Sequence, residues 1–414
     1  MRSLKRAALA ACAASAITLA AYTPAVAQEA EVIHWWTSGG ESAALQEFVS
    51  RFEAAGGTWV DTAIAGGTNA RTAGINRIVG GDAPTAMQFN TGRQFEEVAA
   101  GGLLNDIEAV ASRGGWRDLI PASFVDAISY DGEIYAVPVN IHGQNWMFYN
   151  NAVLEEAGVA PPQTWEDVLA AAEKIEAAGK IPFAQGGEPW QERTLFNAVL
   201  AGHGGPELYD RLYAQNDVAA LDTEEFRAVA DVFGRLRAIV DEGSPGRSWN
   251  ETTNLVVTGR AAMQLMGDWA KGEFLAAGQT PGEEYGCALV GANEALIIGG
   301  DVFVFPATDD EAQRAAQEML AEVMFSPEAQ IAFNNVKGSI PVRSDVDVSG
   351  MDACAQRGAE VMSDPAKQVP QVNLVASSDL VGAVDDVITQ YWNDPSMDAD
   401  AFVARFREAM EIAG

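Results

Sequence analysis

Tryptophans stand beside the turns that end several predicted strands. The chain holds ten tryptophans, and those beside such turns are Trp35, Trp36, Trp190, Trp249 and Trp269. An indole covers the C–H-rich face of a sugar ring, while charged or amide groups bind its rim of hydroxyls. A single tryptophan is more often a core residue, but neighbours on a strand point to opposite faces, so Trp35 and Trp36 cannot both enter one core. The pair therefore favours a sugar-binding surface.

Charged side chains accompany these indoles at glycine-rich turns. The candidates are Glu41, Asp268, Asp301 and Lys337. Glu41 follows Trp36 across a glycine-rich turn, and Asp268 directly precedes Trp269. Asp301 and Lys337 are each next to a glycine. Ionised groups make short, strong hydrogen bonds to hydroxyls, and residues at the ends of elements can converge on one site. This pattern predicts a binding site built from loops.

Two of these carboxylates, Glu41 and Asp301, could instead act as the acid and base of a glycoside hydrolase. No Ser, His and Asp residues have the motif spacing of nucleophilic catalysis. Three histidines and three cysteines are too few and too scattered for a metal centre. We therefore predict no metal and no cofactor, and we keep an exported hydrolase as the alternative to a binding protein.

The composition excludes several classes of partner. The 414 residues include 26 Lys and Arg against 58 Asp and Glu, which gives a net charge of -32. So acidic a surface repels phosphate backbones and anionic lipids, so neither nucleic-acid binding nor membrane attachment is expected. The length suits two α/β domains, and we expect a soluble monomer.

The first 27 residues have the features of a cleavable export signal. Arg2, Lys5 and Arg6 precede an apolar stretch over residues 7–21, and residues 25–27 read Ala-Val-Ala, a small-x-small cleavage site. Removing three basic residues and no acidic ones changes the net charge from -32 to -35. A lipidation site at Cys12 is the alternative, but only five apolar residues would precede it. The sequence therefore predicts export, to the periplasm.

Export changes how the cysteines are interpreted. Cys12 would leave with the signal, and the mature chain would keep Cys287 and Cys354. An even number of cysteines in an oxidising compartment favours one disulfide, whereas two buried free thiols remain the alternative.

Apolar runs and amphipathic helical patterns alternate along the whole chain, which predicts an α/β fold with largely parallel strand pairing. Thr164 and Asp167 form a capping-box pattern at one helix start, and Asp222 is the expected cap of another helix that runs to about Val240. Strands are expected at residues 32–36, 58–63, 85–89, 135–139, 146–149, 262–266 and 295–305. Further helices are expected at residues 41–55, 313–325, 379–392 and 399–412.

Several sequence blocks carry a family resemblance. They read HWWTSGGE from His34, PVNIH from Pro138, GGEPWQ from Gly186, SWN from Ser248, MGDWAKGEF from Met266 and FNNVKGSIP from Phe333. In this order they resemble the glucose-binding proteins of ABC importers, within the family 1 extracellular solute-binding proteins. The blocks span nearly the whole mature chain, and the two cysteines are similar to the family's pair.

The resemblance implies a type II periplasmic binding fold, in which two α/β lobes joined by crossing strands close over a sugar. The first lobe would comprise residues 28–139 plus 300–341, and the second 140–299 plus 342–414. By position in the motifs, the implied ligand-binding residues are Trp35, Trp36, Glu41, Gln88, Asn90, Trp249, Trp269, Asp301 and Lys337. The implied partners are a glucose-like monosaccharide and the membrane permease of an ABC importer.

Two departures from the family pattern concern the choice of sugar. Asn90 stands where glucose binders commonly carry a histidine after the glutamine, and the region around Ala376 lacks the family's late His-Gly pair. The resemblance thus implies a sugar ligand but leaves its identity open. A binding protein that presents its closed form to a membrane sensor is a further alternative to import.

Overall fold

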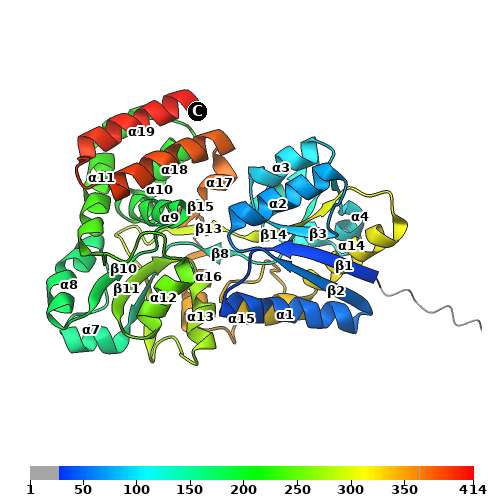
Figure 1. Ribbon diagram of the computed structural model, residues 1–414, viewed down its shortest axis with the longest axis horizontal. Coiled ribbons are helices and arrows are strands. Elements are labelled where there is room, and N and C mark those ends of the chain that lie inside the picture. Colours follow the sequence, from blue (N-terminus) through cyan, green and yellow to red (C-terminus); the bar gives the residue numbers. More distant parts are fainter. Residues whose placement is uncertain (1–27, 363) are drawn as a thin grey trace, which may run out of the picture.

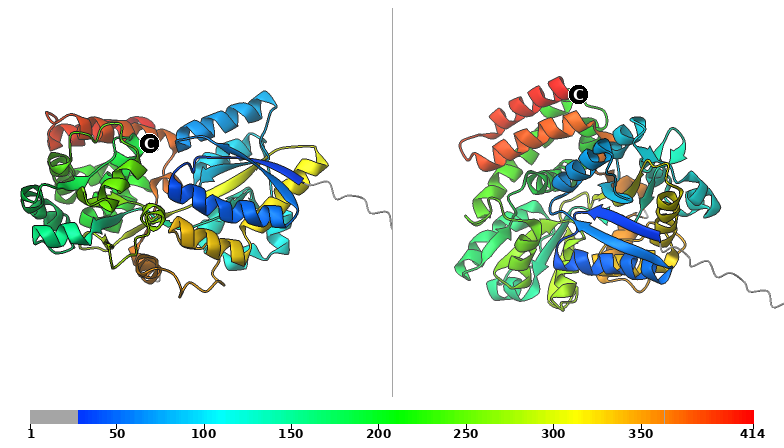
Figure 2. Two further views of the ribbon diagram at one scale, coloured as in Figure 1. Left: turned by 60° about the horizontal axis from the view of Figure 1, so that its bottom comes forward. Right: turned by 45° about the vertical axis from the view of Figure 1, so that its right-hand side comes forward.

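The computed structural model describes residues 28–362 and 364–414. Within them the chain forms two α/β lobes side by side, which we call the first and second lobes after the sheets at their centres (Figure 1). Figure 2 shows the same two lobes from other directions, with the C-terminal helices on the second lobe in each view. The expected export signal lies outside the described residues and stays a prediction.

The first lobe is built on a six-stranded mixed sheet in the order β2-β1-β3-β14-β4, with β7 also paired to β14. Its strands are β1 (Gln28–His34), β2 (Gly57–Ala63), β3 (Ala86–Asn90), β4 (Leu104–Asn105), β7 (Ala136–Pro138) and β14 (Asp301–Pro306). The helices around it are α1 (Gly39–Ala54), α2 (Gly67–Gly80), α3 (Arg93–Ala100), α4 (Glu108–Arg113), α5 (Trp116–Leu119), α6 (Ala122–Ala127), α14 (Glu311–Met324) and α15 (Pro327–Lys337). A short hairpin joins β5 (Ser129–Tyr130) to β6 (Glu133–Ile134).

Helix α1 shows why this lobe forms as it does. Ser38 caps it by accepting the Glu41 N–H, and its buried face, which includes Leu45, Phe48 and Phe52, repeats at helical spacing. Phe48 stacks on Phe333 of α15 with ring centroids 4.4 Å apart. This packing fixes the N-terminus of α1 beside the end of β1, where several candidate site residues stand.

The second lobe is built on a four-stranded sheet in the order β10-β11-β9-β12. Its strands are β9 (Trp146–Asn150), β10 (Ile181–Ala184), β11 (Ala261–Met266) and β12 (Tyr285–Leu289). Its helices are α7 (Asn151–Ala157), α8 (Trp165–Ala177), α9 (Pro189–Val199), α10 (Gly205–Tyr213), α11 (Glu224–Leu236), α12 (Trp249–Val257), α13 (Ala270–Ala276), α16 (Ala353–Met362), α17 (Val372–Val375), α18 (Ser378–Asn393) and α19 (Ala399–Ala413). The predicted capping box of Thr164 and Asp167 is confirmed at the start of α8.

A third, three-stranded sheet lies where the chain passes between the lobes. It contains β8 (His142–Gly143), β13 (Leu296–Gly299) and β15 (Gln368–Pro370), in the order β15-β13-β8. Next to it, Ile141 and Ile340 exchange backbone hydrogen bonds of 2.7 and 3.0 Å. The segments that cross the junction are therefore held to one another by backbone hydrogen bonds. The residue limits expected for each lobe stay a prediction.

The structure corrects three of the expectations drawn from the sequence. Strand pairing is not largely parallel, because β9 pairs antiparallel with both neighbours and β14 does so with β3, β4 and β7. The single strand expected at residues 295–305 is two strands in different sheets, divided at Gly300. A Cβ at Gly300 would lie 2.3 Å from the Asn140 carbonyl oxygen, and periodicity cannot reveal so close an approach.

The third correction concerns the start of α11. Thr223, not Asp222, caps the helix by accepting the Phe226 N–H at 3.2 Å. The α-helix ends at Leu236, and residues Arg237–Ile239 continue as a 3₁₀ turn instead of reaching Val240 in α-helical form. Asp and Thr are both good caps, so composition alone could not choose between neighbours.

Candidate functional site

His142 lies at the centre of the junction between the lobes, with a carboxylate at each ring nitrogen. Nδ1 lies 2.5 Å from Asp268 Oδ1, and Nε2 lies 3.0 Å from Asp301 Oδ2. Asp268 follows β11 of the second lobe, whereas Asp301 begins β14 of the first. The Gly143 N–H donates to Asp268 Oδ2 at 2.8 Å. One imidazole thus connects charged groups of both lobes.

Asp301 receives further donors from the first lobe and from the crossing segment. Asn140 Nδ2 donates to its Oδ2 at 3.1 Å, and Asn90 Nδ2 donates to its Oδ1 at 3.0 Å. Asn90 Oδ1 in turn accepts from the Arg71 guanidinium at 3.2 Å. That guanidinium lies over the Trp35 ring, 5.2 Å from its centroid. The predicted pair Asn90 and Asp301 is therefore brought together, and Arg71 on α2 joins it.

The charges of this network are set by burial and by neighbours. Burial alone would lower the pKa of His142, but the charge of Asp268 and hydrogen bonds with Asp268 and Asp301 raise it to about 9. Burial opposes the ionisation of Asp301, yet the hydrogen bond and charge of His142 hold its pKa below the usual range. Burial and then the charge of Arg193 lower the pKa of Arg71 to about 10. At neutral pH, His142 and Arg71 are cations and Asp301 is an anion.

A second buried ion pair lies beside the first tryptophans. Lys337 Nζ, at the end of α15, donates to Glu41 Oε1 of α1 at 2.7 Å. Both side chains are almost fully buried, at 2% and 8% exposure. Lys337 Nζ also lies 5.4 Å from the centroid of the Trp36 ring. The structure therefore joins three predicted site residues from segments almost 300 positions apart.

The two neighbouring tryptophans have different surroundings. Trp36 is 1% exposed and packs against Phe303 at 5.5 Å and Phe333 at 5.1 Å between ring centroids. Trp35 is half-buried at the end of β1, beneath Arg71. Only one of the pair enters the core, as the sequence predicted. In this arrangement the Trp36 ring packs on protein, so its stacking on a ligand stays a prediction.

Gln88, in the middle of β3, has an unpartnered donor. Its Oε1 accepts the Trp35 N–H at 3.1 Å, whereas its Nε2 has no hydrogen-bond partner among the described residues, although the residue is 1% exposed. Leaving a buried amide group unpaired costs roughly 1–3 kcal/mol. A ligand hydroxyl is the kind of group that would satisfy it.

The second lobe contributes a group of indoles. The Trp190 and Trp269 ring centroids are 6.2 Å apart, and Trp269 meets the His142 ring edge to face at 5.0 Å. Trp249 begins α12, where its carbonyl accepts a hydrogen bond from Gln264 at 3.3 Å. In the described chain, Trp249 has no hydrogen bond or ring contact with the other predicted site residues. Its place around a ligand stays a prediction.

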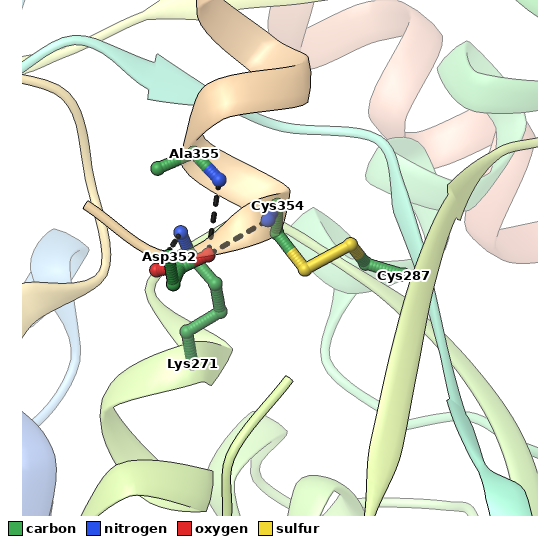
Figure 3. Close-up of a disulfide and its surroundings, with 5 residues drawn as sticks. All are labelled: Lys271, Cys287, Asp352, Cys354 and Ala355. Carbon is green, nitrogen blue, oxygen red and sulfur yellow. Dashed lines mark hydrogen bonds and ion pairs between the residues drawn. A yellow bond between two sulfur atoms is a disulfide. The ribbon is translucent and has the colours of Figure 1, made fainter. Parts of the chain in front are cut away.

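The predicted disulfide is confirmed: Cys287 of β12 is bonded to Cys354 of α16, across a sequence separation of 67 (Figure 3). Next to it, Asp352 accepts the backbone N–H groups of Cys354 and Ala355, at 2.8 and 3.0 Å. The same carboxylate accepts from Lys271 of α13 at 2.9 Å. The bridge and this ion pair attach α16 to the sheet and to α13 of the second lobe.

The sequence interpretation did not identify Arg71, Asn140 or His142 as site residues. Asn140 and His142 lie within the block beginning at Pro138, which was the one available signal, whereas Arg71 lies on a helix with no motif.

No group of three or more His, Cys, Asp or Glu residues in the described chain is arranged to hold a metal ion. Nor does any described helix combine the length and apolar character needed to cross a membrane. Two surface hollows lie elsewhere, one of about 280 Å³ beside Trp116 and Phe325, the other of about 220 Å³ beside Pro341 and Met351.

Comparison with known proteins identifies the family. Residues 36–331 match the family described as bacterial extracellular solute-binding protein. The chain belongs to this family. A probable sugar-binding periplasmic protein of Brucella suis is 38% identical over 398 residues, which cover 93% of each chain. A protein of the same description from Rhizobium meliloti is 36% identical over 410 residues, 97% of this chain and 98% of that one.

Solved structures of solute-binding proteins share the fold of this family member. A chitin oligosaccharide binding protein superposes with a TM-score of 0.77 at 19% identity, covering 94% of this chain and 99% of that one. The maltose-bound MalE3 of T. maritima superposes with a TM-score of 0.73 at 17% identity, over 93% and 99% of the two chains. At such identities the likeness establishes the two-lobed fold of the solute-binding protein and nothing finer.

Proposed function

We propose that this solute-binding protein captures a neutral sugar between its lobes and delivers it to an ABC importer. The observation that carries the proposal is the balance of charge at the junction. Among the described residues, His142 lies between Asp268 and Asp301, and Lys337 pairs with Glu41, while Arg71 is linked to Asp301 through Asn90. Because these groups neutralise one another, indoles and amides are left to recognise an uncharged, polyhydroxylated ligand. The curated names of the Brucella and Rhizobium relatives support a sugar.

In this proposal the ligand-binding residues divide between the lobes. The first lobe supplies Trp35 just after β1, Gln88 and Asn90 on β3, and Trp36, Glu41, Asp301 and Lys337 around them. The second lobe supplies Trp249 and Trp269. The indoles cover the sugar faces, the unpartnered Gln88 amide donates to a hydroxyl, and the charged groups contact the rim.

Binding works by closure of the lobes. A ligand that contacts both lobes in the closed form raises the population of that form by its difference in affinity for the two states. Contacts between the lobes support this mechanism: the Gly40 N–H of α1 donates to Glu273 of α13 at 2.9 Å. Gln371 also donates to the Thr91 carbonyl at 2.8 Å. These contacts stabilise the closed form without touching a ligand.

We further propose a glucose-like monosaccharide as the ligand, on the strength of the sequence blocks alone. The test is a thermal-shift screen over monosaccharides and short oligosaccharides, since a ligand that binds the folded state raises its apparent stability. D-glucose or a close epimer should give the largest increase in Tm. A larger increase with an oligosaccharide would overturn the monosaccharide proposal, and no shift with any sugar would overturn sugar binding itself.

A hydrolase based on Glu41 and Asp301 is not supported by their surroundings. Glu41 is paired with Lys337, and Asp301 accepts from Asn90, Asn140 and His142. A general acid needs a raised pKa, whereas that of Asp301 is lowered. Prolonged incubation with a labelled maltooligosaccharide should release no product. Turnover that disappears in Glu41→Gln while affinity is kept would establish the hydrolase instead.

The proposed location is the periplasm, and the proposed state is a monomer that meets a membrane permease. Mass analysis of protein secreted by a Gram-negative host should find the chain beginning at Gln28, and sedimentation should give the mass of one chain.

Deleting the permease gene of an importer encoded beside the gene for this protein should abolish uptake of the sugar. Uptake that persists while a transcriptional response to the sugar is lost would favour the sensor alternative.

A further inference from the structure

His142 connects the parts of the junction that belong to different lobes. It lies on the segment that crosses between β7 and β9 and is 4% exposed. Its two ring nitrogens face Asp268, from the second lobe, and Asp301, from the first. Its ring also contacts Trp269, which directly follows Asp268. Of these three contacts, Asp301 and Trp269 belong to the proposed sugar site, and Asp268 directly precedes Trp269.

We propose that His142, protonated on both ring nitrogens, is the positioning residue that holds Asp301 and Trp269 in place for ligand binding. The inference rests on the proposed function, because it assigns a role to residues of that same site. His142 acts through its neighbours and is not itself a ligand contact. Sugar affinity then depends on the charge of this one side chain.

The carboxylate oxygen near each ring nitrogen favours two protons on the ring. A nitrogen that carries no proton would direct its lone pair at a carboxylate oxygen, 2.5 Å away at Nδ1 or 3.0 Å away at Nε2. Such a contact is repulsive, whereas an imidazolium donates to both oxygens at once. Asn140 Nδ2, 3.0 Å from Nε2, also donates to Asp301 Oδ2, so the two donors share that acceptor. The doubly protonated ring is therefore the form that fits.

The groups around His142 agree with this charge state. Asp268 and Asp301 face it directly, Lys337 acts on Asp301 from α15, and Arg71 reaches Asp301 only through Asn90. The pKa of His142 is raised to about 9, against the effect of burial, by the two carboxylates. The imidazolium is thus the major form at neutral pH and is lost in the alkaline range.

The Asp301 carboxylate and the Trp269 ring would both be released by loss of this charge. Without the imidazolium, the junction loses one N–H donor and the positive charge between the two buried carboxylates. The carboxylates then repel each other without compensation. Trp269 would face a neutral ring instead of a cationic one, which weakens the attraction that orients the indole. Both changes lower affinity without removing any atom that touches the sugar.

The experiment compares His142→Gln with His203→Gln, which changes an exposed histidine in the short π-helix Leu200–Gly204 of the second lobe. D-glucose affinity is measured by calorimetry at about pH 7 and about pH 9.5, on either side of the His142 transition. Wild type and His203→Gln should both lose affinity at the higher pH. His142→Gln should bind at least roughly tenfold more weakly at neutral pH and show no further loss around pH 9. A folded His142→Gln protein with wild-type affinity would overturn the proposal.

A second measurement needs neither the variant nor a ligand. The chain has three histidines, so ¹⁵N-histidine spectra of the wild type are simple enough to follow each ring. His142 should show two protonated nitrogens at neutral pH, and the Trp269 indole signal, assigned with Trp269→Phe, should move as His142 loses its proton. A neutral His142 ring at neutral pH, or a Trp269 signal that ignores the titration, would overturn the proposal. If D-glucose does not bind, D-glucose is ruled out as the ligand, while these spectra still decide the role of His142.

Discussion

Two of the predicted ligand-binding tryptophans, Trp36 and Trp269, have different surroundings. Trp36 is enclosed by Phe303, Phe333 and Lys337, so its removal would leave a cavity in the first lobe. Trp269, on the second lobe, is half-buried and contacts only the rings of Trp190 and His142 among the described aromatic groups. The same substitution should therefore affect different properties at the two positions.

Trp36→Ala should lower the free energy of unfolding by about 3–5 kcal/mol, because it empties a fully packed site. Trp269→Ala should instead weaken sugar binding by about 1–3 kcal/mol and change stability much less. Urea unfolding and calorimetric titration of both variants measure the two effects. The contrast would be refuted if Trp269→Ala proved the more unfolded of the two while keeping wild-type affinity.

His142 should also make the stability of the protein fall on the alkaline side. Its pKa is raised from 6.5 to about 9 on folding, so its contribution is complete below about pH 6.5 and is lost as pH rises through about 9. The difference corresponds to about 3 kcal/mol. Unfolding measured across this range should lose stability in the wild type and lose less in His142→Gln. Parallel curves for the two proteins would contradict this assignment.

Lys337 and Glu41 should depend on each other. Breaking a buried ion pair leaves an uncompensated charge, which costs about 3–5 kcal/mol, whereas replacing both partners is often nearly neutral. Lys337→Met should therefore destabilise the first lobe, and Lys337→Met combined with Glu41→Leu should recover much of the loss. Thermal unfolding of the two single variants and the double variant gives the coupling. Simple addition of the two single effects would argue against a charge pair.

At the scale of elements, the junction depends on the close approach of α1 to α13. A Cβ at Gly40 would lie 2.5 Å from the Gly272 carbonyl carbon and 2.9 Å from Glu273 Oε1. The Glu273 carboxylate meets the N-terminus of α1, where free N–H groups and the helix dipole favour an anion. Two glycines thus allow helices of different lobes to touch.

Gly40→Ala should hold the lobes apart and reduce sugar affinity about tenfold or more, since the added methyl group occupies the contact of the closed form. Gly39→Ala is the matched control, because its Cβ would have no neighbour closer than Glu273 Oε2 at 4.0 Å. Calorimetry gives the affinity, and X-ray scattering with and without sugar reports closure. Equal affinity in the two variants would show that closure does not need this contact.

At the scale of the molecule, one covalent bond joins parts of the second lobe that are distant in sequence. The Cys287–Cys354 bridge closes a loop with a separation of 67, and the loop includes the passage through β13 and β14 into the first lobe and back. The disulfide therefore constrains a path that visits both lobes.

Reducing this bridge should lower the free energy of unfolding by about 4 kcal/mol on the chain-entropy model. The double variant Cys287→Ala, Cys354→Ala should show the lower stability from the start and should not respond to reductant. Urea unfolding with and without reductant tests both expectations. Two titratable thiols in native exported protein would contradict the bridge.

The sequence alone determined much of this protein because several of its signals are local. Hydrophobic period and capping residues placed α1, α8, α14, α18 and α19 within a few residues, and the ordered blocks indicated the family and the cysteine pair. These features depend on residues close in the chain, or on a pattern read position by position. The resemblance also grouped Glu41, Asp301 and Lys337, although it could not show what they contact.

Only the tertiary structure decided which of these groups meet. The pairing of Lys337 with Glu41 joins positions 296 residues apart, and His142 reaches Asp268 and Asp301 across 126 and 159. No periodicity encodes such contacts, because side-chain direction at a turn and the close approach of two lobes are fixed by packing elsewhere. The same reason explains the errors: Gly300 divides a strand because Asn140 lies against it, and the charge of His142 follows from carboxylates that lie far from it in the chain.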